Sequence, residues 1–179
     1  DVEERLKKIL DFLKIVTNNN EIYVNENVYL SEKETGSRNR ALAYFMKSTG
    51  VLDGDVEEIL DLYFKQCSIE LDARDLARFG VVLANDGVLP WNGRKVIPKD
   101  VCRIVKSIMV TCGMYDASGE FAVNVGIPAK SGVGGGIIAT VPRQYGIGIY
   151  GPALDEKGNS IAGLKLIKDL SDELDLSIF

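Results

Sequence analysis

Residues 135–142 (GGIIATVP) and 145–151 (YGIGIYG) are the stretch of sequence that decides the fold. Both runs contain isoleucine, threonine or tyrosine, which favour β-strands, and Pro142-Arg143-Gln144 separates them. Together they predict an antiparallel hairpin. Glycine alternates with larger side chains in the second run, which indicates that a backbone or a helix packs closely on one face of it.

Helical periodicity flanks the hairpin on both sides. Apolar residues recur every three or four positions in several segments, as on the buried face of an amphipathic helix. The predicted helices are residues 2–16, 38–48, 55–67, 71–84 and 98–111 before the hairpin, and residues 160–174 after it. Residues 21–36 lack a clear period and are expected to be irregular.

Particular residues refine these helices. The buried stripe of the third helix is expected to include Phe64 and Cys67, with Tyr63 beside it. Gly80 weakens the fourth helix by about 1 kcal/mol relative to alanine, which predicts a close neighbour at that point. Pro98 is expected to be the first residue of the fifth helix, where the N–H that proline lacks would have no partner.

The order of elements predicts an α+β fold that is mostly helical, followed by an antiparallel hairpin or partial sheet and a C-terminal helix. Residues 1–120 are expected to be the helical part, and residues 121–179 the strands and last helix of the same domain. A small sheet covered by one helix has exposed edges, and an isolated hairpin is only marginally stable in water. Part of the domain is therefore expected to be missing from this chain.

Composition limits the chemistry and the partners. The 179 residues include 21 Lys plus Arg against 26 Asp plus Glu, an acidic balance that argues against a nucleic-acid partner. Histidine is absent, which excludes Ser-His-Asp catalysis and His-ligated zinc within the chain, so that Lys, Tyr or a carboxylate must move any proton. The three cysteines form no C-x-x-C pair, which favours a cytoplasmic protein without a metal or other cofactor. No apolar run is long enough to predict a membrane span.

Lys130-Ser131-Gly132 is the first segment that could carry chemistry, because it stands just before a predicted strand. There the ammonium could polarise a site and the hydroxyl could donate a hydrogen bond, while glycine would let a substrate approach the backbone. Alternatively, the triplet is fortuitous, since a K-[ST]-G sequence is expected in roughly one chain in ten of average composition.

Two further segments have both a functional and an ordinary interpretation. Tyr115 lies in a glycine-flanked turn within CGMYDASGEFA (112–122), where a phenol near an ammonium could act as a base, or could simply cover the core with its hydroxyl in water. Glu32 and Asn39 flank a short loop in SEKETGSRNRA (31–41). They could pair with the ammonium and carboxylate of an amino acid, or belong to a solvated charged loop.

Longer runs of the sequence, taken in order, resemble one family. They are SEKETGSRNRALAYFMKS (31–48), DLYFKQCSIE (61–70), ANDGVLPWNGRKV (84–96), MVTCGMYDASGEFAVNVGIPAKSGVGGGI (109–137) and DEKGNSIAGLKLIKDLS (155–171). These runs resemble the serine-dependent glutaminases, which share the β-lactamase and penicillin-binding-protein fold. The resemblance extends over essentially the whole chain.

The resemblance implies a reaction and a set of residue roles. In the family, a serine attacks the side-chain amide of L-glutamine, ammonia leaves, and water releases L-glutamate. By resemblance, Glu32 pairs with the substrate ammonium, Asn39 hydrogen-bonds the amino-acid head, and Tyr63 contacts the substrate. Tyr115 resembles the tyrosine hydrogen-bonded to the nucleophile, and Val133 would contribute a backbone N–H to the oxyanion hole. Lys130 and Ser131 would belong to the strand that borders the pocket.

One family feature is absent from this sequence. The family nucleophile lies in an S-x-x-K motif, and no serine here is followed three residues later by lysine. The resemblance therefore implies the C-terminal part of a longer, homo-oligomeric glutaminase, inactive without its nucleophile. One alternative is a non-catalytic fragment that self-associates or binds glutamate weakly. Another is a β-lactamase-like hydrolase of a different substrate, against which the Glu32 and Asn39 pair argues.

Overall fold

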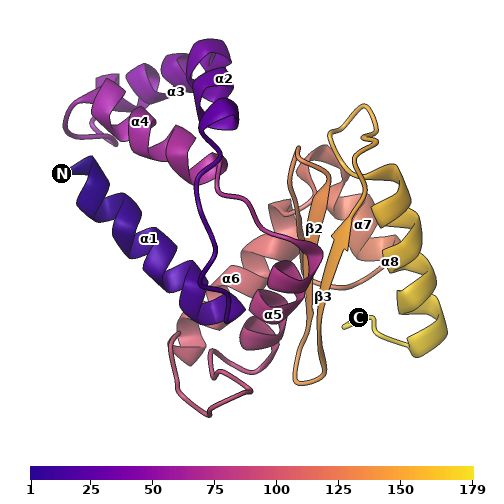
Figure 1. The fold of residues 1–179 in the computed structure, drawn as a ribbon. Coiled ribbons are helices and arrows are strands. Elements are labelled where there is room, and N and C mark those ends of the chain that lie inside the picture. The colour runs from indigo at the N-terminus through magenta and orange to yellow at the C-terminus, as the bar shows by residue number, and fades with distance from the viewer. The chain divides into compact units, whose positions relative to one another are not determined.

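The computed structural model describes residues 1–179 as a chain of helices with one small sheet (Figure 1). The elements are α1 (Val2–Thr17), α2 (Glu26–Thr35), α3 (Ser37–Ser48), α4 (Val56–Cys67), α5 (Ala73–Ala84), α6 (Lys99–Cys112), the 3-10 helix η1 (Tyr115–Ala117), α7 (Ser118–Asn124), β1 (Ala129–Ser131), β2 (Gly136–Val141), β3 (Tyr145–Tyr150) and α8 (Ile161–Leu174). The mostly helical fold with an antiparallel sheet and a C-terminal helix agrees with the sequence prediction.

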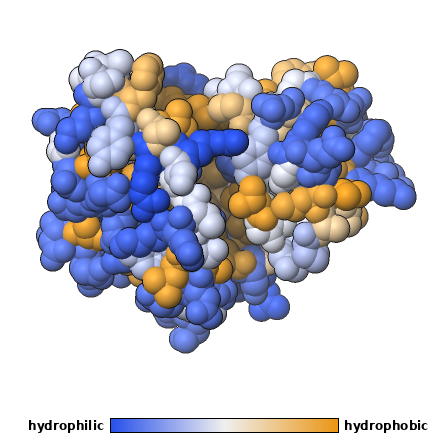
Figure 2. Space-filling view, turned by 90° about the horizontal axis from the view of Figure 1, so that it is seen from above, coloured by the Kyte–Doolittle hydropathy of each residue, from blue (hydrophilic) through white to orange (hydrophobic).

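Residue contacts group the chain into two compact units. Unit 1 contains Asp1–Ile15 and Asn19–Leu71, and unit 2 contains Val16–Asn18 and Asp72–Phe179. The expected change from helices to strands near residue 120 therefore lies within unit 2 and not at the boundary between the units. No helix in either unit combines the length and the apolar character needed to cross a membrane. Figure 2 shows hydrophilic residues over most of the face that it presents, with hydrophobic residues in smaller groups among them.

Helices α2, α3 and α4 share the core of unit 1. Its buried side chains are Tyr29, Ala43, Val56, Leu60 and Phe64. The break between α2 and α3 lies at Gly36, where an added Cβ would come within 2.4 Å of the Phe64 ring. Glycine at this break therefore lets two successive helices pack on the same aromatic side chain.

The sequence prediction for residues 21–36 was wrong, because α2 occupies most of this stretch. Only Tyr29 of α2 is buried, while Val28 and Leu30 are exposed, so the helix shows no clear apolar stripe. Its start is instead fixed by Asn25, whose side chain accepts a hydrogen bond from the Val28 N–H. An N-cap of this kind was the signal for α2 that periodicity could not provide.

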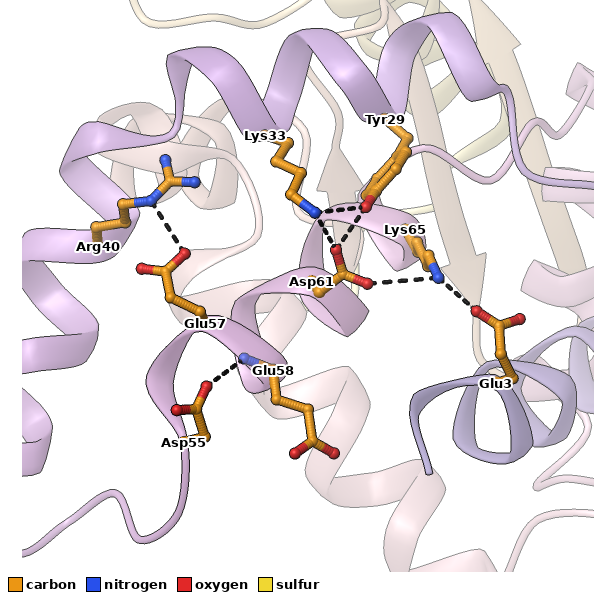
Figure 3. A network of polar contacts seen from close by, with 9 residues as sticks. All are labelled: Glu3, Tyr29, Lys33, Arg40, Asp55, Glu57, Glu58, Asp61 and Lys65. Carbon is orange, nitrogen blue, oxygen red and sulfur yellow. Dashed lines mark hydrogen bonds and ion pairs between the residues drawn. The ribbon is translucent and has the colours of Figure 1, made fainter.

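Asp61 on α4 joins α1, α2 and α4 in unit 1 (Figure 3). Its carboxylate accepts a hydrogen bond from the Tyr29 hydroxyl at 2.5 Å and pairs with Lys33 at 2.6 Å and with Lys65 at 3.4 Å. Lys65 also pairs with Glu3 of α1. Partial burial would raise the pKa of Asp61, but the hydrogen bonds from Lys33 and Tyr29 outweigh it and lower this pKa to about 2.

Unit 2 is built around an antiparallel sheet of order β1-β2-β3, in which Ala139 pairs with Ala129 on one side and Ile147 on the other. This confirms the predicted hairpin and places Lys130 and Ser131 on an edge strand. Helices α5 and α8 lie on opposite sides of β2 and β3 (Figure 1). The core on the α8 side includes Ile137, Val141, Ile149, Phe121, Ile127 and Ile167.

Glycines allow α5 to lie directly on the hairpin. A Cβ added to Gly148 would lie 1.9 Å from the Ala73 carbonyl oxygen, and one added to Gly146 would lie 2.0 Å from the Val81 nitrogen. From the helix side, a Cβ on Gly80 would lie 2.5 Å from the Ala139 carbonyl oxygen. These contacts confirm the close packing that the sequence predicted for Gly80 and for the alternating glycines of the second strand.

Two details of unit 2 differ from the sequence prediction. Pro98 is the N-cap of α6 rather than its first helical residue, because the helix begins at Lys99. The short helix α7 was not predicted, since seven residues are too few to establish a period. Strand β1 was expected only from the family resemblance, because its three residues show no period of their own.

We expect Asp61→Asn to reduce the free energy of unfolding by about 2 kcal/mol at pH 7, because Lys33 and Lys65 lose their shared anion. The folded-state pKa of Asp61, about 2, lies below its ordinary value of 3.8. The stabilisation is therefore complete above pH 5 and disappears as the pH falls towards 2. Urea unfolding at a series of pH values measures this difference.

Asp11→Asn is the matched control, because Asp11 pairs with Lys7 at an exposed position of α1. We expect it to cost less than about 0.5 kcal/mol at every pH. If Asp61→Asn lowered stability equally at pH 7 and pH 2, the shape of the side chain rather than its charge would be responsible.

Candidate active site

The candidate residues fall into two sets, one in each unit. Glu32, Asn39 and Tyr63 lie in unit 1, and we call them the Glu32 set. The other four, Tyr115, Lys130, Ser131 and Val133, lie in unit 2, and we call them the Tyr115 set.

The Glu32 set comes from three successive helices. Glu32 lies within α2, Asn39 in the first turn of α3, and Tyr63 on α4. Glu32 and Asn39 therefore lie on two helices that meet at Gly36, and not on the flanks of an irregular loop as the sequence suggested. Packing of Gly36 on Phe64 holds this junction beside the neighbouring residue Tyr63.

The Tyr63 hydroxyl is where the three side chains of the set interact. It donates a hydrogen bond to the Cys67 sulfur and receives one from the Asn39 amide, and it lies within the electrostatic influence of Glu32. The hydrogen bond to Cys67 raises the pKa of Tyr63, the negative charge of Glu32 adds to this, and the bond from Asn39 opposes it. The phenol therefore stays protonated and serves as a hydrogen-bonding group.

Glu32 makes no ion pair within the chain, although Lys33 is its neighbour. Lys33 turns to Asp61, and Arg40 of α3 turns to Glu57 at 3.4 Å (Figure 3). The Glu32 carboxylate therefore keeps an unneutralised charge beside the amide of Asn39. This arrangement suits a ligand that presents a cation next to a hydrogen-bond acceptor.

Cys67 contacts the Glu32 set through Tyr63, and the sequence analysis missed this contact. Cys67 was expected on the buried stripe of α4, but it is exposed and lies one helical turn after Tyr63. Only Val56, Leu60 and Phe64 of the predicted stripe are buried. The spacing of four residues between Tyr63 and Cys67 was the available signal, since such pairs are neighbours on a helix.

Tyr115 is the first residue of η1. Its φ of +53° lies in the left-handed region, which residues other than glycine seldom adopt. Such a conformation costs on the order of 1–3 kcal/mol and persists only where the surrounding structure fixes it. Gly113, just before the turn, allows the end of α6 to touch β1, because a Cβ there would lie 1.8 Å from the Ala129 carbonyl oxygen. The Ser131 N–H donates to the Gly113 carbonyl at 3.0 Å.

Lys130 lies over Tyr115. Its ammonium nitrogen is 4.5 Å from the centre of the Tyr115 ring, within cation–π range, and it donates a hydrogen bond to the Ser131 carbonyl. Although much of the side chain is exposed, partial burial lowers the pKa of Lys130, and the nearby Cys112 thiol opposes this shift. The structure therefore brings together the ammonium that the sequence analysis expected to polarise a site and the phenol that it named as a possible base.

The backbone N–H of Val133 is available to a ligand, whereas the side chain of Ser131 is buried. Val133 lies in the loop between β1 and β2, where the Gly132 and Gly135 N–H groups donate backbone hydrogen bonds but that of Val133 donates none. Its side chain is exposed, and its backbone N–H could bind an oxyanion. Ser131 is buried, and its hydroxyl has no hydrogen-bond partner within the chain.

The two sets offer different chemistry. The Glu32 set combines an anion, an amide and a phenol, which can bind the head of a zwitterionic amino acid. The Tyr115 set combines a phenol, an ammonium and a free backbone N–H, which can transfer a proton and stabilise an oxyanion. No group of three or more Cys, Asp or Glu side chains is arranged to hold a metal ion.

This chain is similar to known proteins in both sequence and structure. A family model described as Glutaminase matches residues 1–179. The chain is 71% identical over 177 residues to Glutaminase 2 of Clostridium perfringens (strain 13 / Type A), covering 99% of this chain and 58% of that protein. It is 68% identical over 179 residues to a glutaminase of Clostridium botulinum (strain Loch Maree / Type A3), covering 100% and 59%. The chain thus spans a little more than half the length of these relatives.

Solved structures give the same assignment. One is the covalent complex between the Bacillus subtilis glutaminase YbgJ and 5-oxo-L-norleucine, formed by reaction with 6-diazo-5-oxo-L-norleucine. It matches with a TM-score of 0.96 at 47% identity, covering 100% of this chain and 63% of that chain. A structure of Mglu matches with a TM-score of 0.96 at 38% identity, covering 100% of this chain and 45% of that chain. The glutaminase neighbours have the β-lactamase-like fold that the sequence resemblance implied. Because the family model matches every residue, this chain belongs to the glutaminase family.

Proposed function

We propose that this chain forms part of an enzyme that hydrolyses L-glutamine to L-glutamate and ammonia through a serine acyl-enzyme. The observation that carries the proposal is the family match over all 179 residues, at 68–71% identity to clostridial glutaminases. The YbgJ complex supports the substrate class. Its bound group, 5-oxo-L-norleucine, is an α-amino acid with a carbonyl where glutamine has its amide carbon.

The Glu32 set binds the amino-acid head in this proposal. Glu32 has no cation partner within the chain, so its carboxylate is available for the substrate's α-ammonium. Asn39 then donates to the α-carboxylate. Tyr63 orients the Asn39 amide through the hydrogen bond between them. In this proposal, the Glu32 set binds the α-ammonium and α-carboxylate of the substrate, and the side-chain amide of the substrate remains accessible to the Tyr115 set.

The Tyr115 set acts at the side-chain amide. The Val133 N–H stabilises the oxyanion that forms when the nucleophile attacks, so the identity of its side chain matters little. The Tyr115 phenol carries a proton between the nucleophile and the leaving ammonia. Lys130, held over the Tyr115 ring, favours negative charge as it develops on the phenol. Ser131 belongs to the same strand as Lys130, which borders the pocket in this proposal.

The nucleophile is not provided by an S-x-x-K motif in this sequence. We therefore expect the 179 residues alone to be inactive, and their proposed contribution is recognition and proton transfer. A non-catalytic fragment that binds glutamate weakly is the alternative in which no activity appears in any context. A β-lactamase-like hydrolase of another substrate is disfavoured, because a free carboxylate beside an amide suits a zwitterion better than a β-lactam.

We also propose a cytoplasmic location and a homo-oligomeric state. Three free cysteines are compatible with a reducing compartment. Helix α3 exposes Leu42, Tyr44 and Phe45, and covering such side chains favours association with another copy.

A chimera tests the proposed function. In it, this chain replaces the matching part of the C. perfringens protein, to which it is 71% identical. We expect the chimera to release glutamate from glutamine, and the 179-residue chain to release none above a Lys130→Ala control. An inactive but folded chimera would favour the non-catalytic alternative. Release by the chain alone that depends on Lys130 would indicate a nucleophile within it, with Ser131 the first candidate.

Glu32→Gln in the chimera is expected to raise KM and to lower kcat/KM tenfold or more, on the order of 1.4 kcal/mol, because the substrate ammonium loses its counterion. Steady-state kinetics with glutamine measure both constants. Glu34→Gln is the matched control, since Glu34 lies on the same helix, is exposed, and belongs to neither set. Equal kinetics for the Glu32 and Glu34 variants would remove Glu32 from the site.

Tyr115→Phe in the chimera is expected to lower kcat by about a hundredfold while KM changes by less than about twofold, because the phenol moves a proton and does not hold the head. Tyr145→Phe, at an exposed tyrosine of β3, serves as the control and should leave both constants unchanged. A rise in KM alone would make Tyr115 a binding residue.

A further inference from the structure

We propose that Asn159 is a positioning residue for Tyr115. Its buried side-chain amide holds the carbonyl of Met114 and so fixes the left-handed turn from which the Tyr115 phenol projects. This inference rests on the function proposed above for Tyr115, and it adds a residue outside both sets.

The turn itself is closed by Ser118. The Ser118 hydroxyl receives a hydrogen bond from the Met114 N–H at 3.0 Å and donates one to the Tyr115 carbonyl at 2.7 Å. These bonds satisfy the backbone N–H of the residue before Tyr115 and the carbonyl of Tyr115 itself. They come from within the turn, however, so they do not fix the turn relative to the rest of unit 2.

Asn159 provides a link to a distant part of unit 2. Its Nδ2 donates to the Met114 carbonyl oxygen at 3.2 Å, across 45 residues of sequence. Asn159 has no exposed surface, and its Oδ1 has no hydrogen-bond partner within the chain. A buried amide with one unpaired atom is unfavourable for packing alone, so its value lies in the bond that it does make.

The loop that carries Asn159 is held at both ends. The Asp155 carboxylate accepts hydrogen bonds from the Lys157 and Asn159 N–H groups at 2.9 Å, and the Asp155 N–H donates to the Asn159 carbonyl at 2.8 Å. The next residue, Ser160, caps α8 by accepting from the Gly163 N–H. The Asn159 amide therefore projects from a loop anchored to a helix that is itself part of the core.

The same loop also passes close to the Tyr115 set. Gly158 has a φ of +90°, and a Cβ on it would lie 3.6 Å from the Tyr115 ring and 3.7 Å from the Val133 side chain. The loop thus lies beside both the proposed proton carrier and the residue that offers the proposed oxyanion donor. Movement of Asn159 would alter the turn and the ring together.

Kinetics of the chimera provide the first test. We expect Asn159→Ala to lower kcat at least tenfold while KM changes by less than about twofold, because the amino-acid head is bound by the other set. Asn159→Asp, which keeps the size but replaces the donor with an acceptor, should lower kcat at least as much. Asn85→Ala is the matched control, since the Asn85 amide also donates to a backbone carbonyl, that of Val88, at 2.9 Å. It should leave both constants unchanged.

A double-mutant cycle separates positioning from general loss of stability. If Asn159 acts through Tyr115, adding Asn159→Ala to Tyr115→Phe should lower kcat by less than a further twofold. If the two effects multiply in full, Asn159 acts through general stability and not through Tyr115, and the inference is wrong.

A measurement on the 179-residue chain is independent of catalysis. With 3-fluorotyrosine at its seven tyrosines, the Tyr115 resonance is the ¹⁹F signal that disappears in Tyr115→Phe. We expect Asn159→Ala to shift this resonance and Asn85→Ala to leave it in place. A resonance unmoved by Asn159→Ala overturns the positioning role. A shift, combined with full activity of Tyr115→Phe, would instead retain the positioning and refute the proposed function of Tyr115.

Discussion

Direct contact between the backbone of α5 and the backbone of β3 is the constraint on which unit 2 depends. Gly146 and Gly148 leave no side chain between the strand and the helix, and Gly80 removes the corresponding side chain from α5. On the opposite face of the hairpin, Ile137 and Ile149 join the core on the α8 side. A side chain at any of these glycines would force the helix away from the sheet. The edge strand β1, which pairs with β2, would lose its support as well.

The same principle of close backbone approach places the catalytic candidates. Gly113 lets the end of α6 touch β1, and the turn that contains Tyr115 comes directly after it in the sequence. Lys130 projects from this strand over the Tyr115 ring, so that an ammonium and a phenol from different elements meet. The left-handed backbone conformation of Tyr115 costs free energy locally, and the packing of the sheet and the neighbouring loop holds it in place.

Much of this fold could be predicted from the sequence, because alternating glycines and long apolar periods are local signals. The hairpin, α1 and α8 follow from them directly. Helix α2 could not be found in this way, since Asn25 and tertiary contacts define it more than any apolar stripe. Local patterns singled out five candidates of the two sets, which are Glu32, Asn39, Tyr115, Lys130 and Ser131. Tyr63, Val133 and the particular roles of all seven came from the family resemblance. Asn159 was missed because its hydrogen bond to Met114 joins positions 45 residues apart. Cys67 was missed for a different reason, since it was placed on the buried stripe of α4 although it is exposed beside Tyr63.

In unit 1, the ion pairs between neighbouring side chains leave the Glu32 carboxylate without a cation partner. Lys33 follows Glu32 in sequence, yet Asp61 draws it away, together with Lys65 (Figure 3). Arg40 is similarly occupied by Glu57. An ion pair with any of these cations would neutralise Glu32 before a ligand arrived. The Asp61 network therefore joins α1, α2 and α4, and it also occupies Lys33, so that Glu32 has no cation partner, as its proposed role in binding a substrate ammonium requires.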